Sequence, residues 1–424
     1  MKYWLVGIKG TGMSALACIL SSLNYEVLGS DVKDYYFTEK ALRSSNIKYF
    51  EFNKNNIRNN NKCFYIISNA YDKSNVEVNE IINKEYKYMY YSEFINYFFK
   101  GIKIGISGTH GKTTTTSMCV KLFEDERICA LIGNGTGIGM DNYKYFIFEA
   151  CEYRNNFLKY DYDYLIINNI DYDHVDFFDS IEQVIESFQI AAKKSRFIIC
   201  NNDDLYSRNI EHKNKITFGK SFDSDYVISK INKYKDGFVI QVVSKYAEEI
   251  IKVPLVGEHN IYNFVAAYVL TKELNINVNI QDKIYHFKMP KRRMEEYIFK
   301  NNIIIDDYAH HPKEIKCLLE SIKQKYDKDI IVIFQPHTYS RTIKLEKEFR
   351  NLFDEVELFL CNTYTSVREQ KSDILEEKVK SIFPKSKEYS QSTIKYLNNV
   401  YNKVIVFLGA GIISNDINKL LYVN

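Results

Sequence analysis

Residues 108–116 read Gly-Thr-His-Gly-Lys-Thr-Thr-Thr-Thr, and this stretch decides how the chain around it folds. The apolar run 102–107 precedes it, and the helix-compatible run 117–122 follows it. A strand, a glycine loop ending in Lys-Thr and a helix form a cradle for phosphate groups, because backbone N–H groups and the helix N-terminus face the anion. The pattern predicts that Lys112 reaches the β- and γ-phosphates of a nucleotide and that the Thr113 hydroxyl ligates Mg²⁺.

This loop departs from the general phosphate-loop pattern at one position. The pattern places its first glycine five residues before Gly111, and Ile106 occupies that position. The sequence therefore predicts a variant loop, different from the loop of the common kinases and GTPases. A glycine- and threonine-rich turn with a surface lysine is the alternative, and the flanking strand and helix argue against it.

Length and composition exclude several classes of protein. The 424 residues predict two to four domains, and 46% hydrophobic with 26% charged residues is typical of globular proteins. The net charge of +3 is spread along the chain, so we expect neither nucleic acid nor a membrane surface as a partner. The eight cysteines form no C-x-x-C pair, which argues against a zinc ribbon or a disulfide framework and favours a reducing, cytoplasmic location. The first residues form an apolar strand rather than a signal peptide, and no apolar run approaches the roughly 18 residues that a membrane helix needs.

Three segments of the chain each begin with an apolar strand and then alternate strands with helices. These first strands start near Tyr3, Ile102 and Ile303. Short apolar runs are typical of strands buried on both faces of a parallel sheet. The sequence therefore predicts an α/β protein with a Rossmann-like N-terminal domain, a central domain like a P-loop ATPase and a Rossmann-like C-terminal domain. Their predicted limits are 1–100, 101–288 and 289–424, and polar–apolar alternation over 220–255 predicts a small antiparallel insert in the central domain.

A second glycine loop, residues 7–14, lies between the first strand and the first helix. A loop in this position can hold a nucleotide phosphate at the N-terminus of the helix. Asp31 closes the next strand, where a carboxylate can meet a ribose hydroxyl. Many α/β domains carry such a turn for packing alone, so binding and packing both remain open for this loop.

Two groups of polar residues follow apolar strands of the central segment. Glu149 ends one strand, and a carboxylate at that strand end, beside the phosphate loop, is placed to hold Mg²⁺. His174 follows the next strand in a group with three acids, Asp171, Asp173 and Asp176. This histidine is a candidate ligand for a second divalent ion. A polar loop on a water-facing edge is the alternative.

The start of a later helix carries amide side chains at helical spacing. Asn260 and Asn263 lie three residues apart and therefore on one helix face. An amide donates and accepts hydrogen bonds at once, which suits the edge of an adenine ring. The same residues also fit an ordinary helix start.

Taken together, these segments resemble the Mur ligases of peptidoglycan synthesis, and the matching motifs run from Gly7 to Gly411. The phosphate loop is similar to the family's ATP loop, and residues 10–14 to its UDP-binding loop. Residues 149–152 and 173–176 resemble its two Mg²⁺ segments, and residues 257–263 its adenine-side helix. Residues 291–293, 306–312 and 335–341 resemble the nucleotide and substrate motifs of its third domain.

The resemblance implies a role for each matching residue. Residues implied in catalysis are Lys112, Glu149, His174 and Arg293, and the implied metal ligands are Thr113, Glu149 and His174. Residues implied to bind ATP are Gly108, Thr109, His110, Gly111, Lys112, Thr113, Thr114, His259, Asn260, Asn263, Arg293 and Asp307. Residues implied to bind the other substrates are Gly10, Thr11, Gly12, Met13, Ser14, Asp31, Ser68, Tyr308, His310, His311, His337 and Arg341.

The sequence departs from the family pattern at a few positions. Lys9 stands where many relatives have glycine, and on a turn we expect it to be harmless. Cys151 and Tyr153 replace the commoner aspartate and serine after Glu-Ala. Ile412 follows the last glycine loop, 409–411, where an acidic or small residue is more usual, so the role of that loop stays open.

The function implied by the resemblance is ATP-dependent amide formation. The lactyl carboxylate of UDP-N-acetylmuramate would take the γ-phosphoryl group of ATP, and the amine of L-alanine would attack the resulting acyl phosphate. ATP and Mg²⁺ are the implied cofactors, and UDP-N-acetylmuramate and L-alanine are the implied small-molecule partners. We expect the chain to be a monomer or a homodimer. Gln189 occupies the position, 15 residues past His174, where other members carry a carbamylated lysine, which argues against the later ligases of the pathway.

Three alternatives accompany this interpretation. A recycling ligase that joins the same UDP-sugar to a tripeptide shares every motif, although the short chain and the Glu-Ala-Cys-Glu-Tyr form favour the alanine branch. The loop 7–14 alone would also suit a nucleotide-dependent oxidoreductase, against which the Lys-Thr loop and the two Mg²⁺ segments argue. The third alternative is an inactive nucleotide-binding scaffold. It predicts that charged residues are missing from the motifs, and none is missing. The sequence does not separate alanine from serine or glycine as the amino acid.

Overall fold

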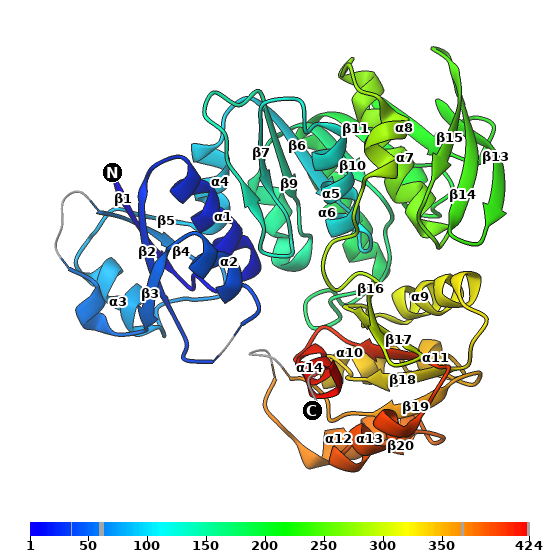
Figure 1. The fold of residues 1–424 in the computed structure, drawn as a ribbon. Coiled ribbons are helices and arrows are strands. Elements are labelled where there is room, and N and C mark those ends of the chain that lie inside the picture. Colours follow the sequence, from blue (N-terminus) through cyan, green and yellow to red (C-terminus); the bar gives the residue numbers. More distant parts are fainter. Residues whose placement is uncertain (35, 59–62, 366–368, 422–424) are drawn as a thin grey trace.

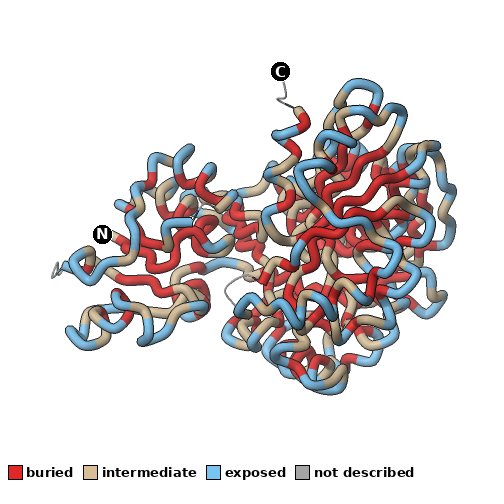
Figure 2. Tube along the Cα trace, turned by 90° about the horizontal axis from the view of Figure 1, so that it is seen from below, coloured by how far each residue is buried: buried red, intermediate tan, exposed pale blue. Residues whose placement is uncertain are grey.

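The computed structural model describes residues 1–34, 36–58, 63–365 and 369–421, and the strands of these residues form three sheets. Figure 1 shows them in three lobes, coloured blue, cyan to green, and yellow to red along the chain. Figure 2 shows that the buried residues run through the interior of the molecule, whereas exposed residues gather on its outside. Within the described part of the chain, every helix is too short or too polar to cross a lipid bilayer.

The first sheet has the strand order β3-β2-β1-β4-β5, and each neighbouring pair runs parallel. This order matches half of a doubly wound fold, in which ligands lie at the carboxyl ends of the strands. Its strands are β1 (Lys2–Val6), β2 (Glu26–Asp31), β3 (Lys48–Glu51), β4 (Cys63–Ile67) and β5 (Tyr88–Tyr90). Its helices are α1 (Thr11–Ser22), α2 (Glu39–Ser44), α3 (Val76–Asn83) and α4 (Tyr91–Phe98).

The central sheet has the order β15-β14-β13-β12-β11-β10-β6-β9-β7-β8. Its strands are β6 (Ile102–Ser107), β7 (Ile128–Leu131), β8 (Gly137–Ile138), β9 (Tyr145–Glu149), β10 (Tyr162–Ile167), β11 (Ser195–Asn201), β12 (Lys215–Gly219), β13 (Tyr226–Tyr234), β14 (Gly237–Ser244) and β15 (Glu248–Val253). Its helices are α5 (Lys112–Leu122), α6 (Ile181–Lys193), α7 (His259–Glu273) and α8 (Ile280–Tyr285). The predicted antiparallel insert is confirmed as β13–β15, which continue the parallel sheet rather than forming one of their own.

The third sheet has the order β16-β17-β21-β18-β19-β20. Its strands are β16 (Glu295–Phe299), β17 (Asn302–Asp307), β18 (Ile330–Phe334), β19 (Glu357–Leu360), β20 (Lys387–Glu388) and β21 (Val404–Leu408). Its helices are α9 (Pro312–Lys325), α10 (Tyr339–Lys344), α11 (Glu346–Phe349), α12 (Asp373–Ile382), α13 (Gln391–Asn399) and α14 (Ile417–Leu421). Strands β18 and β21 are buried along their whole length, as their apolar runs predicted.

Apolar runs did not predict several strands, among them the buried β7 and a number of exposed strands. β16 pairs antiparallel with β17 at the sheet edge, and its Ile298 side chain is exposed. β3 is likewise short and largely exposed, and β5 is short and only partly buried. The domain limits 1–100, 101–288 and 289–424 remain a prediction, and the strands of each sheet lie within one of these ranges.

The first domain packs tightly against the central domain through glycine. A Cβ on Gly137, in β8, would lie 2.0 Å from the carbonyl oxygen of Ala15 in α1. A Cβ on Gly139 would lie 2.4 Å from Oγ of Ser22, at the end of the same helix. Only residues without a Cβ allow α1 to come this close to β8. This contact therefore fixes where the loop at the start of α1 points.

Candidate active site

The phosphate loop joins the end of β6 to the start of α5, as the sequence predicted. Gly111 precedes α5 with a φ of +81°, and a Cβ there would lie 2.3 Å from Oδ1 of Asn263, so this position requires glycine. Lys112 Nζ donates to the backbone oxygens of Gly108 at 2.5 Å and Thr109 at 3.2 Å. The lysine is therefore folded back over the loop.

Glu152 holds Lys112 in this position, with Oε2 3.0 Å from Nζ. Its Oε1 lies 3.4 Å from Nε2 of His174. Burial disfavours the charge on Lys112, but Glu152 outweighs it and raises the pKa of this lysine. Burial likewise opposes the charge on Glu152, whose pKa Lys112 and His174 nevertheless lower. An anion that entered the loop would compete with Glu152 for the lysine.

Glu149 ends β9 beside the loop, at the place where the sequence predicted a metal ligand. Its Oε1 accepts the N–H of Gly133 at 2.6 Å, and a Cβ on that glycine would lie 2.2 Å from the carboxylate. Burial raises the pKa of Glu149, against hydrogen bonds from Thr113 and Gly133 that lower it. The sequence analysis missed Gly133, which carries no reactive group but makes room for the carboxylate.

His174 lines the same cavity as Lys112 and Glu149. Among the described residues its buried Nδ1 has no hydrogen-bond partner, and its backbone has a φ of +53°. The left-handed region is unfavourable for histidine, so the surrounding structure holds this side chain in place at an energetic cost. The nitrogen is therefore available to a ligand in the cavity.

The acids near His174 do not form one cluster. Asp173 Oδ1 accepts from Nε of Arg341 at 2.8 Å, and Asp171 Oδ2 lies 2.6 Å from Nζ of Lys313. Burial opposes the charge on Asp173, but Arg341 lowers its pKa well below the usual range. Both cations belong to the third domain. The alternative for the loop around His174 was a polar edge that faces water. Its acids instead pair with cations of the third domain, so this loop connects the central domain to the third.

Histidines of the third domain lie at this contact. His311 precedes α9, and its Nδ1 accepts the N–H of Lys313 at 3.3 Å. Burial lowers the pKa of His311 to about 4 and that of His310 to about 3, so both rings are neutral near pH 7. Nδ1 of His337 lies 2.9 Å from Nη1 of Arg341, which is itself paired with the central domain.

Glu314 is a site residue that the sequence analysis missed. It occupies the first turn of α9, where a glutamate reads as an ordinary capping residue. Its Oε1 lies 3.4 Å from Nδ1 of His110 and 3.9 Å from Nη1 of Arg293. Burial disfavours a charged His110, but Asp171 and Glu314 outweigh burial and raise the pKa of this histidine to about 9. No local pattern signals contacts between residues this far apart in the sequence.

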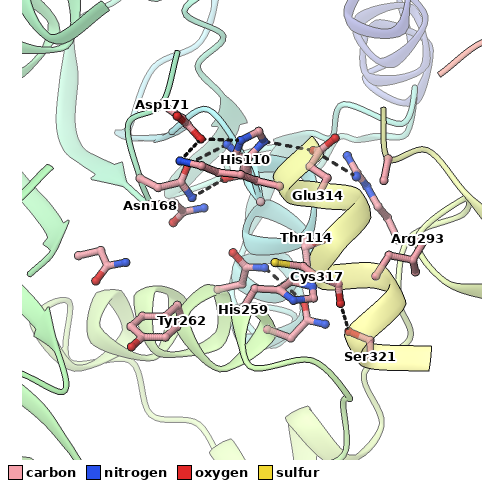
Figure 3. A pocket seen from close by; sticks show the side chains of 18 of the residues that line it. His110, Thr114, Asn168, Asp171, His259, Tyr262, Arg293, Glu314, Cys317 and Ser321 are labelled. Atoms are coloured by element: carbon pink, nitrogen blue, oxygen red, sulfur yellow. Dashed lines mark hydrogen bonds and ion pairs between the residues drawn. The ribbon is translucent and has the colours of Figure 1, made fainter. Parts of the chain in front are cut away.

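A cavity of about 290 Å³ opens between α7, α9 and the phosphate loop, and we call it the first cavity (Figure 3). The expected nucleotide residues that line it are His110, Gly111, Thr114, His259, Asn260, Asn263, Arg293 and Asp307. Residues that were not predicted include Asn168, Asp204, Phe218, Cys317, Leu318 and Ser321. Asn260 Nδ2 donates to the carbonyl of Val256 at 2.8 Å, so part of its hydrogen-bonding capacity is used within the protein.

A larger cavity of about 640 Å³, the second cavity, is lined by residues of all three domains. The predicted residues that line it are Thr11, Thr109, Gly111, Lys112, Thr113, Glu149, His174, Arg293, Tyr308, His310, His337 and Arg341. Residues that line it without having been predicted include Phe37, Lys40, Tyr297, Ser414 and Asn418. Arg293 lines both cavities, and the loop 409–411, whose role the sequence left open, contributes Ala410 to this wall.

Several predicted residues line neither cavity. These are Gly108, Gly10, Gly12, Met13, Ser14, Asp31, Ser68 and His311. The carboxylate of Asp31 is engaged in its own turn, where Oδ2 accepts the N–H of Lys9 at 2.6 Å. Lys9 is buried rather than lying on an open turn, because its Nζ lies 2.9 Å from Glu39 and donates to two backbone carbonyls.

This geometry defines a three-domain α/β protein that carries a phosphate loop beside a cavity shared by its domains. Family models match each part of the chain. The Mur ligase family catalytic domain matches residues 2–102, the Mur ligase middle domain residues 106–271, and the Mur ligase glutamate ligase domain residues 292–411.

Individual relatives match over nearly the whole length. The chain is 37% identical over 421 residues to a UDP-N-acetylmuramate–L-alanine ligase of Lactobacillus acidophilus, covering 97% of this chain and 96% of that one. Its fold is similar to the UDP-N-acetylmuramate–alanine ligase of Thermotoga maritima, with a TM-score of 0.81, 22% identity and 99% and 98% coverage. It is also similar to a murein peptide ligase of Psychrobacter arcticus, with a TM-score of 0.73, 20% identity and the same coverage. The chain belongs to the Mur ligase family.

Proposed function

We propose that this chain is an ATP-dependent ligase that joins L-alanine to the lactyl carboxylate of UDP-N-acetylmuramate in the synthesis of peptidoglycan precursors. The observation that carries the proposal is the 37% identity to a ligase of that name over 97% of the chain. The second cavity supports it, because a phosphate loop faces a space to which all three domains contribute. Membership in the Mur ligase family leaves no support for the alternative of an oxidoreductase or an inactive scaffold.

In the proposed reaction a carboxylate oxygen of the UDP-sugar attacks the γ-phosphorus of ATP and releases ADP. The amine of L-alanine then attacks the acyl phosphate, and inorganic phosphate leaves. Such transfers depend on positioning and charge neutralisation more than on covalent help from the protein. Lys112 would leave Glu152 and neutralise the β- and γ-phosphates. Arg293 would contribute a second positive charge, because it lines both cavities.

The residues at the loop fit Mg²⁺. Thr113 and Glu149 offer oxygen donors of the kind this ion prefers, and the unpaired Nδ1 of His174 is a further donor in the same cavity. Mg²⁺ held by these residues would supply positive charge next to the transferred phosphoryl group.

The remaining assignments follow the two cavities. We assign ATP to the first cavity and to the loop 108–114. We assign the acceptor substrates to the second cavity, with Tyr308, His310, His337 and Arg341 on the side of the third domain. The UDP part would lie at the start of α1, against residues 10–14, and would reach the second cavity at Thr11. We further propose a cytoplasmic monomer or homodimer, in keeping with eight free thiols.

The test is ADP release with ATP, Mg²⁺ and UDP-N-acetylmuramate, run in parallel with L-alanine and with the tripeptide. The proposal expects ADP release that requires L-alanine, and a product one alanine residue heavier than the UDP-sugar. Release that requires the tripeptide instead would make this chain the recycling ligase. Serine and glycine, run in the same assay, define the preference for the amino acid.

A further inference from the structure

Three side chains that can ligate a transition metal lie together where the central and third domains meet. They are His110 of the phosphate loop, Asp171 after β10 and His311 before α9. One ligand atom of each lies within 4.8 Å of the other two. Figure 3 shows His110 and Asp171 side by side at the N-terminal end of α9. This group shares no residue with the proposed Mg²⁺ ligands.

Two ring nitrogens of this group are buried and poorly paired. Among the described residues, Nε2 of His311 has no hydrogen-bond partner, and this residue is only 2% exposed. Nε2 of His110 lies 3.5 Å from Oδ2 of Asp171, which is long for a hydrogen bond. A buried polar atom without a partner leaves its loss of hydration uncompensated. A cation ligated by both nitrogens, in place of their protons, would remove that deficit.

The surroundings of His110 are those of a metal-bound imidazole. Glu314 lies on the far side of the ring, with Oε1 3.4 Å from Nδ1. A carboxylate in this position orients the ring and fixes which nitrogen faces the metal. Asp171 is oriented as well, because its Oδ1 accepts the N–H of Tyr172 at 2.9 Å, whereas Oδ2 faces Nε2 of His110 at 3.5 Å.

Lys313 is the group that competes with a cation here. Its Nζ lies 2.6 Å from Oδ2 of Asp171, but the side chain is 62% exposed and can turn into water. Its backbone N–H donates to Nδ1 of His311 at 3.3 Å, a long bond. Ligation of a metal through Nε2 would move the ring proton to Nδ1, which could then no longer accept this hydrogen bond. The metal–nitrogen bond would take the place of the long hydrogen bond.

We propose that His110, Asp171 and His311 bind a transition-metal dication of the Zn²⁺ class and thereby fasten the third domain to the central domain. Two imidazoles and one carboxylate form a three-ligand set that leaves a fourth position open. Mg²⁺ suits this set poorly, because it prefers oxygen ligands and retains water. Since His110 and Asp171 also line the first cavity, the ion inhibits nucleotide binding rather than assisting the reaction. The site itself does not depend on the proposed ligase reaction.

Co²⁺ titration of the full chain, without nucleotide and with excess Mg²⁺, tests the site directly. Four-coordinate Co²⁺ absorbs visible light far more strongly than the hydrated ion, so binding at this site gives an intense band. One equivalent of Zn²⁺ is expected to abolish that band. Replacing the outer carboxylate, Glu314→Gln, should weaken binding by about 10- to 100-fold.

The matched variant is His311→Asn. Asparagine is a favoured residue before a helix, so this change keeps the start of α9 while removing the distal nitrogen. The variant should lose the band, and so should Asp171→Asn, which serves if the first variant does not fold. His212→Gln is the control. Nε2 of His212 lies 3.0 Å from the carbonyl oxygen of Ser195, so this ring contacts a group that is not part of the proposed site. This control should bind Co²⁺ like the parent.

Two results would overturn the proposal. One is a parent protein that gives only the weak spectrum of hydrated Co²⁺. The other is a band of equal strength in folded His311→Asn and in Asp171→Asn. If that band then disappears in His174→Gln, the ion occupies the proposed Mg²⁺ site instead.

Discussion

The central domain contacts the first domain mainly through apolar side chains and the third domain mainly through polar and charged side chains. Toward the first domain, one hydrophobic cluster runs from Leu5 and Leu16 to Phe188, and the rings of Phe99 and Phe146 stack at 3.9 Å. Toward the third domain, the contact is polar and includes the ion pairs Asp173–Arg341, Asp171–Lys313 and His110–Glu314.

This difference predicts different freedom for the two outer domains. Close-packed apolar surfaces separate only by exposing apolar area and leaving voids, whereas water can replace the partners of charged groups. We therefore expect the first domain to stay fixed on the central domain and the third domain to open and close. On this account, closure of the third domain would bring Arg293, Arg341 and the neutral histidines to the phosphate loop, and opening would release products.

The largest expected effect comes from the phosphate loop, which lies beside the charged contact. Lys112→Ala should reduce the ligation rate by on the order of 10²–10³, because a preorganised charge on the transferred group is worth roughly 3–4 kcal/mol. Rates of single turnover with saturating ATP measure this. Lys121→Ala, a change on the outer face of the same helix, is the control and should keep the parent rate. A Lys112→Ala enzyme with more than about a tenth of the parent rate would mean that this loop is not the catalytic cradle.

The next effect is a dependence of the charged contact on pH. The pKa of His110 is raised from 6.5 to about 9 by its two carboxylate partners, acting against burial. A raised pKa in a base adds stability that is complete below pH 6.5 and is lost as pH rises through about 9, up to about 3 kcal/mol. The thermal midpoint of the metal-free protein should therefore fall across this window. His110→Gln should flatten the slope between these pH values, and an equal slope in both proteins would contradict the assignment.

A smaller effect should follow from filling the apolar contact. Gly137→Ala places a methyl group where the carbonyl oxygen of Ala15 lies, and overpacking of this kind costs about 1–3 kcal/mol. The free energy of unfolding in urea should drop by that amount. Thr136→Ala, at the exposed neighbouring position, is the matched control and should change little. If the two variants are equally stable, the first domain is not held by close packing.

The smallest effect concerns the proposed metal ligands. His174→Ala should raise the Mg²⁺ concentration for half-maximal activity by about 10-fold. Loss of a single group that supports a metal site typically weakens metal binding by at least this much. ATP affinity should change less, because Lys112 and the loop remain. Activity titrated against Mg²⁺ provides the measurement. A curve that coincides with that of the parent would leave His174 as an ordinary loop residue.

The sequence could predict the parts of the fold that depend on local pattern. The apolar runs at 145–149 and 404–408 gave buried parallel strands because their neighbours on both faces are also apolar. The Lys-Thr loop lies at a strand–helix junction for the same local reason. β16 escaped prediction because it is an edge strand whose apolar Ile298 faces water.

The charged contact could not be predicted from the same patterns. Glu314 reads locally as a helix cap, and its pairing with His110 joins residues of different domains. Lys9 reads as a harmless turn residue, and its burial depends on Glu39 and on carbonyls of the following loop. In each case the partner is distant in sequence, so that only the folded chain reveals the pair.

The central claim is that the carboxylate of the UDP-sugar is activated by phosphoryl transfer at this loop. It can be tested with UDP-N-acetylmuramate whose lactyl carboxylate carries ¹⁸O in both oxygens, incubated with ATP, Mg²⁺ and L-alanine. An acyl phosphate transfers one carboxylate oxygen to the phosphate that leaves, so the released inorganic phosphate should contain one ¹⁸O atom. Phosphate without ¹⁸O, formed along with the amide product, would contradict the account.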